Sequence, residues 1–189
     1  MAAQSFADTS SSREYQVKAA FLYNFLMFVD WPQEKMDDSN SPIIIGIIGI
    51  DPFDGAFEPV KDKKANGKQV IVKHFEPFKE MKKNGNTAEY GKKIEDVRKC
   101  HLLFICRSEA DRLKEILDLV RGYSVLTVAD MPDFIEPYEG MINFIMEDKK
   151  VRFEINLAAA QQANLKIRSQ LLRLAKRVIG EESTQEAEK

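Results

Sequence analysis

The run IIIGIIGI at residues 43–50 constrains the fold of this chain more than any other segment. Its residues are all aliphatic or glycine, which is typical of a strand that is buried on both faces of a parallel sheet. The run has eight residues, far fewer than the roughly 20 that a membrane-spanning helix needs. It therefore predicts a core strand of an α/β domain.

Helical and strand patterns alternate along the rest of the chain. We expect an opening helix at 13–29 and a short helix that begins at Asp51, its N-cap, and Pro52. Further strands are expected at 68–75, 100–106, 123–128, 141–147 and 150–156, and further helices at about 88–98, 108–121 and 167–179. This order predicts an α/β fold with a mainly parallel six-stranded sheet, helices on both faces and a C-terminal antiparallel hairpin.

The 189 residues are most simply one domain, at 13–180, between two disordered ends. Residues 1–12 are small and polar, which predicts a disordered leader, and residues 181–189 form an acidic tail. The leader has neither the basic nor the apolar region of a signal peptide. Taken literally, this indicates the cytoplasm, although a mature form without its signal peptide would look the same. The net charge of −2 predicts no nucleic-acid partner.

The two cysteines stand at the ends of one expected strand. Cys100 and Cys106 bracket the apolar run HLLFI, so their Cα atoms should lie about 20 Å apart. A disulfide needs a Cα separation below about 7 Å. We therefore expect two buried thiols, with an intermolecular bridge or an exposed redox thiol as the alternative.

No pattern of catalytic or metal-binding residues stands out. His74 and His101 are the only histidines, and no Cys, His or carboxylate spacing matches a metal site. We therefore expect no catalytic residue, no metal and no cofactor, and hence a protein that is not an enzyme. Ligands favour the carboxyl ends of parallel strands, where Asp51, Arg107 and Asp130 are expected. These three residues define the alternative of a small-molecule-binding sensor.

A candidate surface for a protein partner lies around the C-terminal hairpin. Apolar and polar residues alternate from 151 to 156, so one face should be buried while Arg152 and Glu154 stand on the other. Phe134 and Tyr138 belong to the irregular segment just before the hairpin. Aromatic and charged side chains together are typical of binding surfaces, so we expect these four residues to contact a partner. Ordinary anchoring of the loop is the alternative.

Two expected helices have features beyond the single apolar face that would cover a sheet. Residues 21–29 are apolar almost all round, which indicates either a fully buried helix or a helix with a dimer contact that includes Tyr23 and Trp31. Residues 166–180 carry five positive charges and no acidic residue. Such a basic amphipathic helix can lie on an anionic membrane or form an ordinary surface helix.

Four blocks, in order, resemble the YfiR-like family. They are YQVKAAFLYNFLMFVDWP at 15–32, TVADMPDF at 127–134, GMINFIMEDKKVRFEINLAAA at 140–160 and LKIRSQLLRLAKRV at 165–178. Members of that family often carry Gly-Gly before the MINF strand, and this chain has Glu139-Gly140 instead. The local turn is therefore expected to differ.

The resemblance implies a function without chemistry in this chain. Members of the family are bacterial periplasmic proteins that restrain an inner-membrane diguanylate cyclase, and thereby lower cyclic-di-GMP signalling and biofilm output. The implied partners are the sensor domain of that membrane-bound cyclase and an outer-membrane lipoprotein that acts as antagonist. A homodimer is expected separately, from the apolar surface of the opening helix. The resemblance therefore favours the periplasm for this chain.

Overall fold

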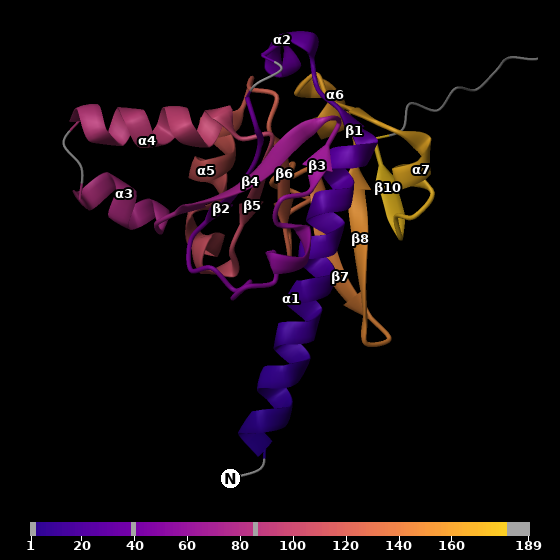
Figure 1. Ribbon diagram of the computed structural model, residues 1–189. Coiled ribbons are helices and arrows are strands. Elements are labelled where there is room, and N and C mark those ends of the chain that lie inside the picture. The colour runs from indigo at the N-terminus through magenta and orange to yellow at the C-terminus, as the bar shows by residue number, and fades with distance from the viewer. Residues whose placement is uncertain (1–2, 39–40, 85–86, 181–189) are drawn as a thin grey trace, which may run out of the picture.

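The computed structural model describes residues 3–38, 41–84 and 87–180 (Figure 1). Eight strands form one sheet in the order β10-β8-β7-β6-β5-β2-β4-β3. These strands are β2 (Ile43–Ile48), β3 (Lys64–Ala65), β4 (Lys68–Phe75), β5 (Leu102–Ile105), β6 (Leu126–Ala129), β7 (Ile142–Glu147), β8 (Lys150–Asn156) and β10 (Arg177–Ile179). Neighbours from β4 to β7 are parallel, as are β8 and β10, whereas β3–β4 and β7–β8 are antiparallel.

Helices cover both faces of this sheet, as expected. The longest, α1 (Ala3–Phe28), runs along one face, and its buried positions include Leu22, Phe25 and Leu26. The opposite face is covered by α3 (Phe78–Asn84), α4 (Thr87–Lys99) and α5 (Leu113–Val120), which gather on one side of the molecule (Figure 1). Shorter helical pieces are α2 (Gln33–Met36), α6 (Leu157–Gln162) and the 3₁₀ segments Glu58–Val60 and Arg107–Arg112. The α/β class and the mainly parallel sheet are confirmed.

The strand count was underestimated. The six expected strands are present, and β3 and β10 extend the sheet at its two edges, while β1 (Val29–Asp30) and β9 (Lys166–Ile167) form a separate antiparallel pair. All four added strands have two or three residues. Segments this short have no periodicity of their own, because tertiary contacts alone decide whether they pair.

The expected basic helix at 167–179 is wrong. The segment is divided among β9, α7 (Ser169–Leu172) and β10. Its backbone finds partners outside itself, since the amides of Arg168 and Lys176 donate to the carbonyls of Phe28 and Phe153, at 2.9 and 2.8 Å. The buried Leu171 anchors the turn between them. Because residues 166–179 are divided among three short elements, they form no continuous amphipathic helix that could lie on a membrane.

The N-terminal end of the chain also differs from expectation. Helix α1 begins at Ala3, so residues 3–12 continue the helix where we expected a disordered leader, and residues 1–2 lie outside the described residues. The expected acidic tail, 181–189, lies outside them as well. Within the described ranges, no helix has the length and apolar character that crossing a membrane requires.

The C-terminal hairpin matches its prediction closely. Strands β7 and β8 join through Asp148 and Lys149, both at positive φ, which is the backbone of a two-residue hairpin turn. Phe144 and Phe153 pair across the hairpin and pack against Phe25 of α1, with ring centroids 5.7 and 5.2 Å away. One face of the hairpin is therefore core and the other is polar.

Candidate functional site

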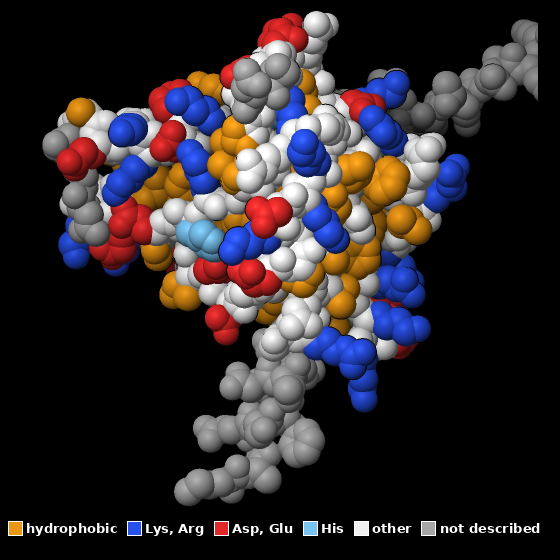
Figure 2. All heavy atoms as spheres, in the orientation of Figure 1, with side chains coloured by type: hydrophobic (Ala, Val, Ile, Leu, Met, Phe, Trp, Pro, Cys, Tyr) orange, Lys and Arg blue, Asp and Glu red, His pale blue; other side chains and the backbone are white. Residues whose placement is uncertain are grey.

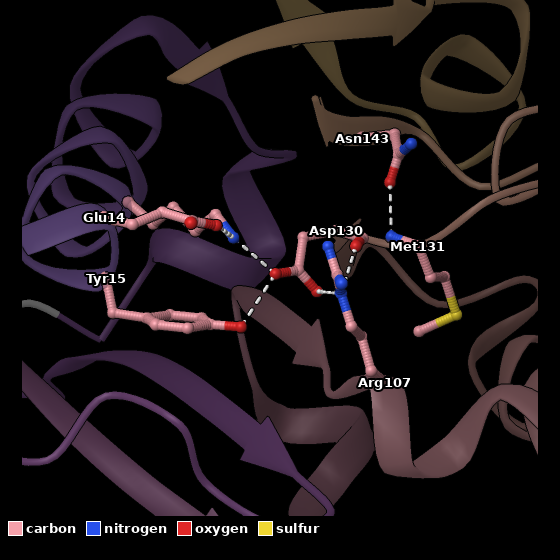
Figure 3. A network of polar contacts seen from close by, with 7 residues as sticks. Glu14, Tyr15, Arg107, Asp130, Met131 and Asn143 are labelled. Carbon is pink, nitrogen blue, oxygen red and sulfur yellow. Dashed lines mark hydrogen bonds and ion pairs between the residues drawn. The ribbon is translucent and has the colours of Figure 1, made fainter. Parts of the chain in front are cut away.

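A buried ion-pair network joins α1 to the carboxyl end of β6 (Figure 3). The Asp130 carboxylate, directly after β6, contacts the Lys18 ammonium, which also contacts Glu14. The Tyr15 hydroxyl donates to Asp130 Oδ2 at 3.0 Å. Arg107 Nε lies 2.7 Å from the Asp130 carbonyl oxygen and 3.3 Å from Oδ1. Three segments far apart in sequence therefore meet on one carboxylate.

The buried charges of this network are balanced by one another. The Lys18 and Asp130 side chains are each 1% exposed, so each charge depends on its partners rather than on water. Burial, followed by the charge of Asp130, raises the pKa of Tyr15, which keeps its hydroxyl a proton donor to the carboxylate. Since every oxygen of Asp130 already accepts a donor, the arrangement positions α1 against the sheet and offers no free general base.

A shallow hollow of about 250 Å³ adjoins the network, with Arg107, Asp130 and Asn143 in its wall. Arg107 is the accessible charge here, because 63% of its side chain is exposed. Asn143 is turned to the loop, since its Oδ1 accepts the Met131 amide at 3.2 Å. Parallel-sheet ligands bind at this end of the strands, so this hollow is the place for the alternative small-molecule site.

The structure brings only two of the three expected ligand residues together. Arg107 and Asp130 are in contact, whereas Asp51 pairs with His74 at 2.9 Å and lines a different hollow. We expected a short helix to begin at Asp51, but no helix begins there. Its Oδ1 accepts the Phe53 amide at 2.8 Å, which stabilises a turn after β2. A shared site for the three residues is therefore not formed.

The expected partner surface is partly assembled. Arg152 and Glu154 stand on the polar face of β8, and Arg177 Nε lies 2.9 Å from Glu154 Oε1. Arg177 Nη1 also lies 3.0 Å from Glu136 Oε2, so it joins the strand to the loop that carries Tyr138. Tyr138 itself is 39% exposed. Glu136, Glu154 and Arg177 therefore form one cluster of paired charges between β8, β10 and this loop.

Phe134 does not belong to that surface. It is 0% exposed and packs into the second core layer, beside α5. A Cβ atom at Gly140 would lie 2.3 Å from the Phe134 ring, so this ring needs a glycine opposite it. The expectation of a partner contact at Phe134 is therefore wrong. Its side chain packs into the core and holds the loop in place.

The two residues expected in a dimer contact are used within the chain. Trp31 is buried, and its Nε1 donates to the His101 carbonyl at 3.1 Å. The Tyr23 hydroxyl donates to the Lys64 carbonyl at 2.9 Å. The apolar surface around α1 is covered from its sides by β3 and by the C-terminal segment, with Arg168 Nε 3.0 Å from Asp30.

The cysteines and His101 are buried groups. Cys100 and Cys106 are free, as the strand geometry predicted. Burial raises the pKa of Cys100 to about 12 and also raises that of Cys106, so both thiols stay protonated and unreactive. Burial lowers the pKa of His101 to about 4, and its Nδ1 accepts the Ile44 amide at 3.1 Å. In the described ranges, no group of three or more His, Cys, Asp or Glu residues is arranged to hold a metal ion.

Sequence reasoning missed Lys18, the central cation of the network. The available signal was a lone charge inside the apolar stretch QVKAAFLYNF, opposite an acidic residue at a strand end. Lys18 and Asp130 fall in the first and second of the blocks quoted above, and Phe134 and Gly140 join the second to the third. Those blocks therefore mark structural contacts between distant segments.

A family model described as YfiR/HmsC-like matches residues 15–176, which is nearly the whole described domain. No curated protein matches the chain significantly.

Proposed function

Because this chain belongs to the YfiR/HmsC-like family, which implies a periplasmic regulator of diguanylate cyclase signalling, we propose that it binds the periplasmic sensor region of an inner-membrane diguanylate cyclase and inhibits that enzyme. The family match over residues 15–176 is the observation that carries this proposal. An outer-membrane lipoprotein that competes for the chain, and a homodimer as its working form, complete the proposed system.

The candidate site supports a binding role for the chain. Its central charges, Lys18 and Asp130, are buried and paired with each other, and they hold α1 against the sheet. The charged face of β8 and the preceding loop is different, since Arg152 is exposed and has no ion-pair partner among the described residues. A partner could bind this face without any change in the core.

We place the partner contact on Tyr138, Arg152 and Glu154. Figure 2 shows Lys and Arg side chains gathered beside the tip of the β7–β8 hairpin. The exposed basic residues there are Lys149, Lys150 and Arg152. Complementary charge steers association and favours an acidic partner surface. Tyr138 supplies an exposed aromatic ring on the loop whose Glu136 is paired with Arg177 of β10.

The test is a pull-down from solubilised membranes of the source bacterium, with the purified chain as bait and mass spectrometry as readout. We expect recovery of a membrane protein that has a periplasmic sensor and a cytoplasmic cyclase domain. Arg152→Glu should weaken that capture about tenfold or more, because it reverses a charge in the contact. Lys92→Glu is the matched control, since Lys92 is exposed on α4, away from the hairpin.

Two results would overturn the proposal at different levels. If a folded bait captures no cyclase, the regulatory role fails. If a cyclase is captured equally well by the parent chain, Arg152→Glu and Lys92→Glu, the role stands and the surface assignment is wrong.

The alternative, a small-molecule sensor at Arg107, has weaker support. The hollow there measures about 250 Å³, below the roughly 300 Å³ at which ligand pockets begin. The Nε–H group of Arg107 already donates to the Asp130 carbonyl oxygen, so few convergent polar groups remain for a ligand. A thermal shift with amino acids or cofactors, abolished by Arg107→Ala, would favour this function.

A further inference from the structure

One edge of the sheet is open along most of β4. The antiparallel partner β3 pairs with β4 only at Gln69 and Lys68, and the Val70 amide then donates to the Lys63 carbonyl at 3.2 Å. Beyond Val70, β4 has no strand neighbour on its outer side in the described chain. β4 crosses the near side of the molecule in Figure 1.

The backbone groups at this edge can be assigned from the pairing on the other side. The Phe75 carbonyl accepts the Gly49 amide, which follows β2, so Phe75 is turned toward β2. Successive residues of a strand alternate in the direction of their amide and carbonyl groups. The amide and carbonyl groups of Val72 and His74 therefore point away from β2, outward from the edge of the sheet. Such a row of groups is a template for one more strand.

Two hollows flank the same edge, one on each face of the sheet. On the α1 face, about 460 Å³ is enclosed by Phe57, Val60, Val70 and Val72. On the opposite face, about 530 Å³ lies over Lys73 and Phe75, against α3 and α4. Because strand side chains alternate between faces, a strand added to β4 would point its side chains into the two hollows in turn.

The charges around the first hollow indicate what would enter it. Its lining is largely apolar and also carries three carboxylates, Asp51, Glu58 and Asp62. His74 lies 2.9 Å from Asp51 and Lys61 lies 3.7 Å from Glu58, so the acidic side chains still outnumber the lysine. An apolar side chain would pack against the apolar lining, and a basic side chain two positions along the same strand would meet the carboxylates.

We propose that the outer edge of β4 binds an extended segment of a partner protein as an additional strand, with an apolar residue in the hollow beside Val72 and a basic residue two positions away near the carboxylates. Main-chain hydrogen bonds to Val72 and His74 supply affinity, and the hollow supplies selectivity for the side chain. This proposal does not depend on the partner of the hairpin surface, which lies at the other end of the sheet.

The probe is a synthetic peptide with fluorescein on its N-terminus, fluorescein-Thr-Thr-Phe-Thr-Lys-Thr-Thr-amide, titrated with the full chain in fluorescence anisotropy. The key variant is His74→Pro, which removes an outward amide and leaves the bonds to β2 intact. His74→Ala is the matched control, because it removes the same side chain and keeps the amide. Circular dichroism and thermal unfolding of each variant verify that it is folded.

We expect saturable binding by the parent chain and by His74→Ala, and binding about tenfold weaker in His74→Pro, equivalent to the loss of one well-formed hydrogen bond. Replacing the peptide Phe by Ala should weaken binding similarly. Slower hydrogen exchange of the Val72 and His74 amides in the complex would support strand addition directly.

The proposal is overturned by absence of binding up to about 1 mM of the protein, or by equal affinity in His74→Pro and His74→Ala. It is also overturned if His74→Pro abolishes a concentration-dependent dimer in sedimentation, because the strand that pairs with β4 would then come from a second copy.

Discussion

Removing the Lys18 ammonium tests the buried network most directly. Lys18→Met keeps the length of the side chain but leaves the Asp130 carboxylate with Tyr15 and Arg107 only. Both partners of the lost pair are 1% exposed, so water cannot replace the cation. Removing one partner of a buried ion pair typically lowers the free energy of unfolding by about 3–5 kcal/mol. Because Tyr15 and Arg107 still donate to Asp130, we expect a loss of about 3 kcal/mol.

A double-mutant cycle separates the pair from general packing. Asp130→Asn alone should also lower the free energy of unfolding by about 3 kcal/mol, since it leaves the Lys18 cation buried. In the double variant neither charge remains, so the combined loss should be about 2 kcal/mol smaller than the sum of the single losses. The assay is urea unfolding, followed by circular dichroism and by the fluorescence of the single tryptophan, Trp31.

An exposed pair gives the matched control. Lys114 and Asp118 lie 2.7 Å apart on α5, with Lys114 76% exposed, and Lys114→Met should cost no more than about 0.5 kcal/mol. Additive losses in the cycle, or equal losses for Lys18→Met and Lys114→Met, would refute the reasoning, because the buried pair would then contribute nothing specific.

Three further predictions concern single positions. Gly140→Ala should cost about 3 kcal/mol or more, because its Cβ would lie 2.3 Å from a buried ring, whereas Gly91→Ala in α4, with no atom within 4 Å, should add about 0.5–1 kcal/mol in urea unfolding. Lys149→Gly should raise the free energy of unfolding by up to about 1 kcal/mol in the same assay, because φ is 60° at this hairpin position, and a loss would contradict the turn assignment. In the folded protein His101 stays neutral down to its pKa of about 4, whereas in the unfolded chain it binds a proton near pH 6.5. The free energy of unfolding should therefore fall between pH 6.5 and 4, by about 2–3 kcal/mol more than in His101→Gln. Parallel pH profiles for the two proteins would exclude this linkage.

The local patterns of this chain predicted most of its regular elements. The hairpin at 141–156 is present with the expected turn, because strict alternation and a two-residue connection leave one register. The apolar run at 43–50 forms the interior strand β2 over Ile43–Ile48, where both faces of a parallel sheet are buried, whereas Ile50 beyond the strand is 71% exposed. The two buried free thiols likewise follow from the reach of one strand.

The candidate site could be predicted only in part. The polar face with Arg152 and Glu154 follows from alternation, but the burial of Phe134 does not, because an irregular loop has no period that separates inside from outside. Trp31 was misplaced for a similar reason: its position after α1 gives no sign that a distant carbonyl, that of His101, accepts its indole N–H.

By itself, the sequence determined the α/β class, the order of the core elements, the hairpin and its register, because these depend on residues that are neighbours in the chain. Only the tertiary structure decided that residues 167–179 abandon a helical pattern, that Lys18 and Asp130 meet, and that the edge of β4 stays open. The first two depend on partners more than twenty residues away, and the third on how few residues of β4 the short strand β3 covers. The free energy gained by pairing a buried charge, or by satisfying a backbone group there, exceeds the small local preference for a helix.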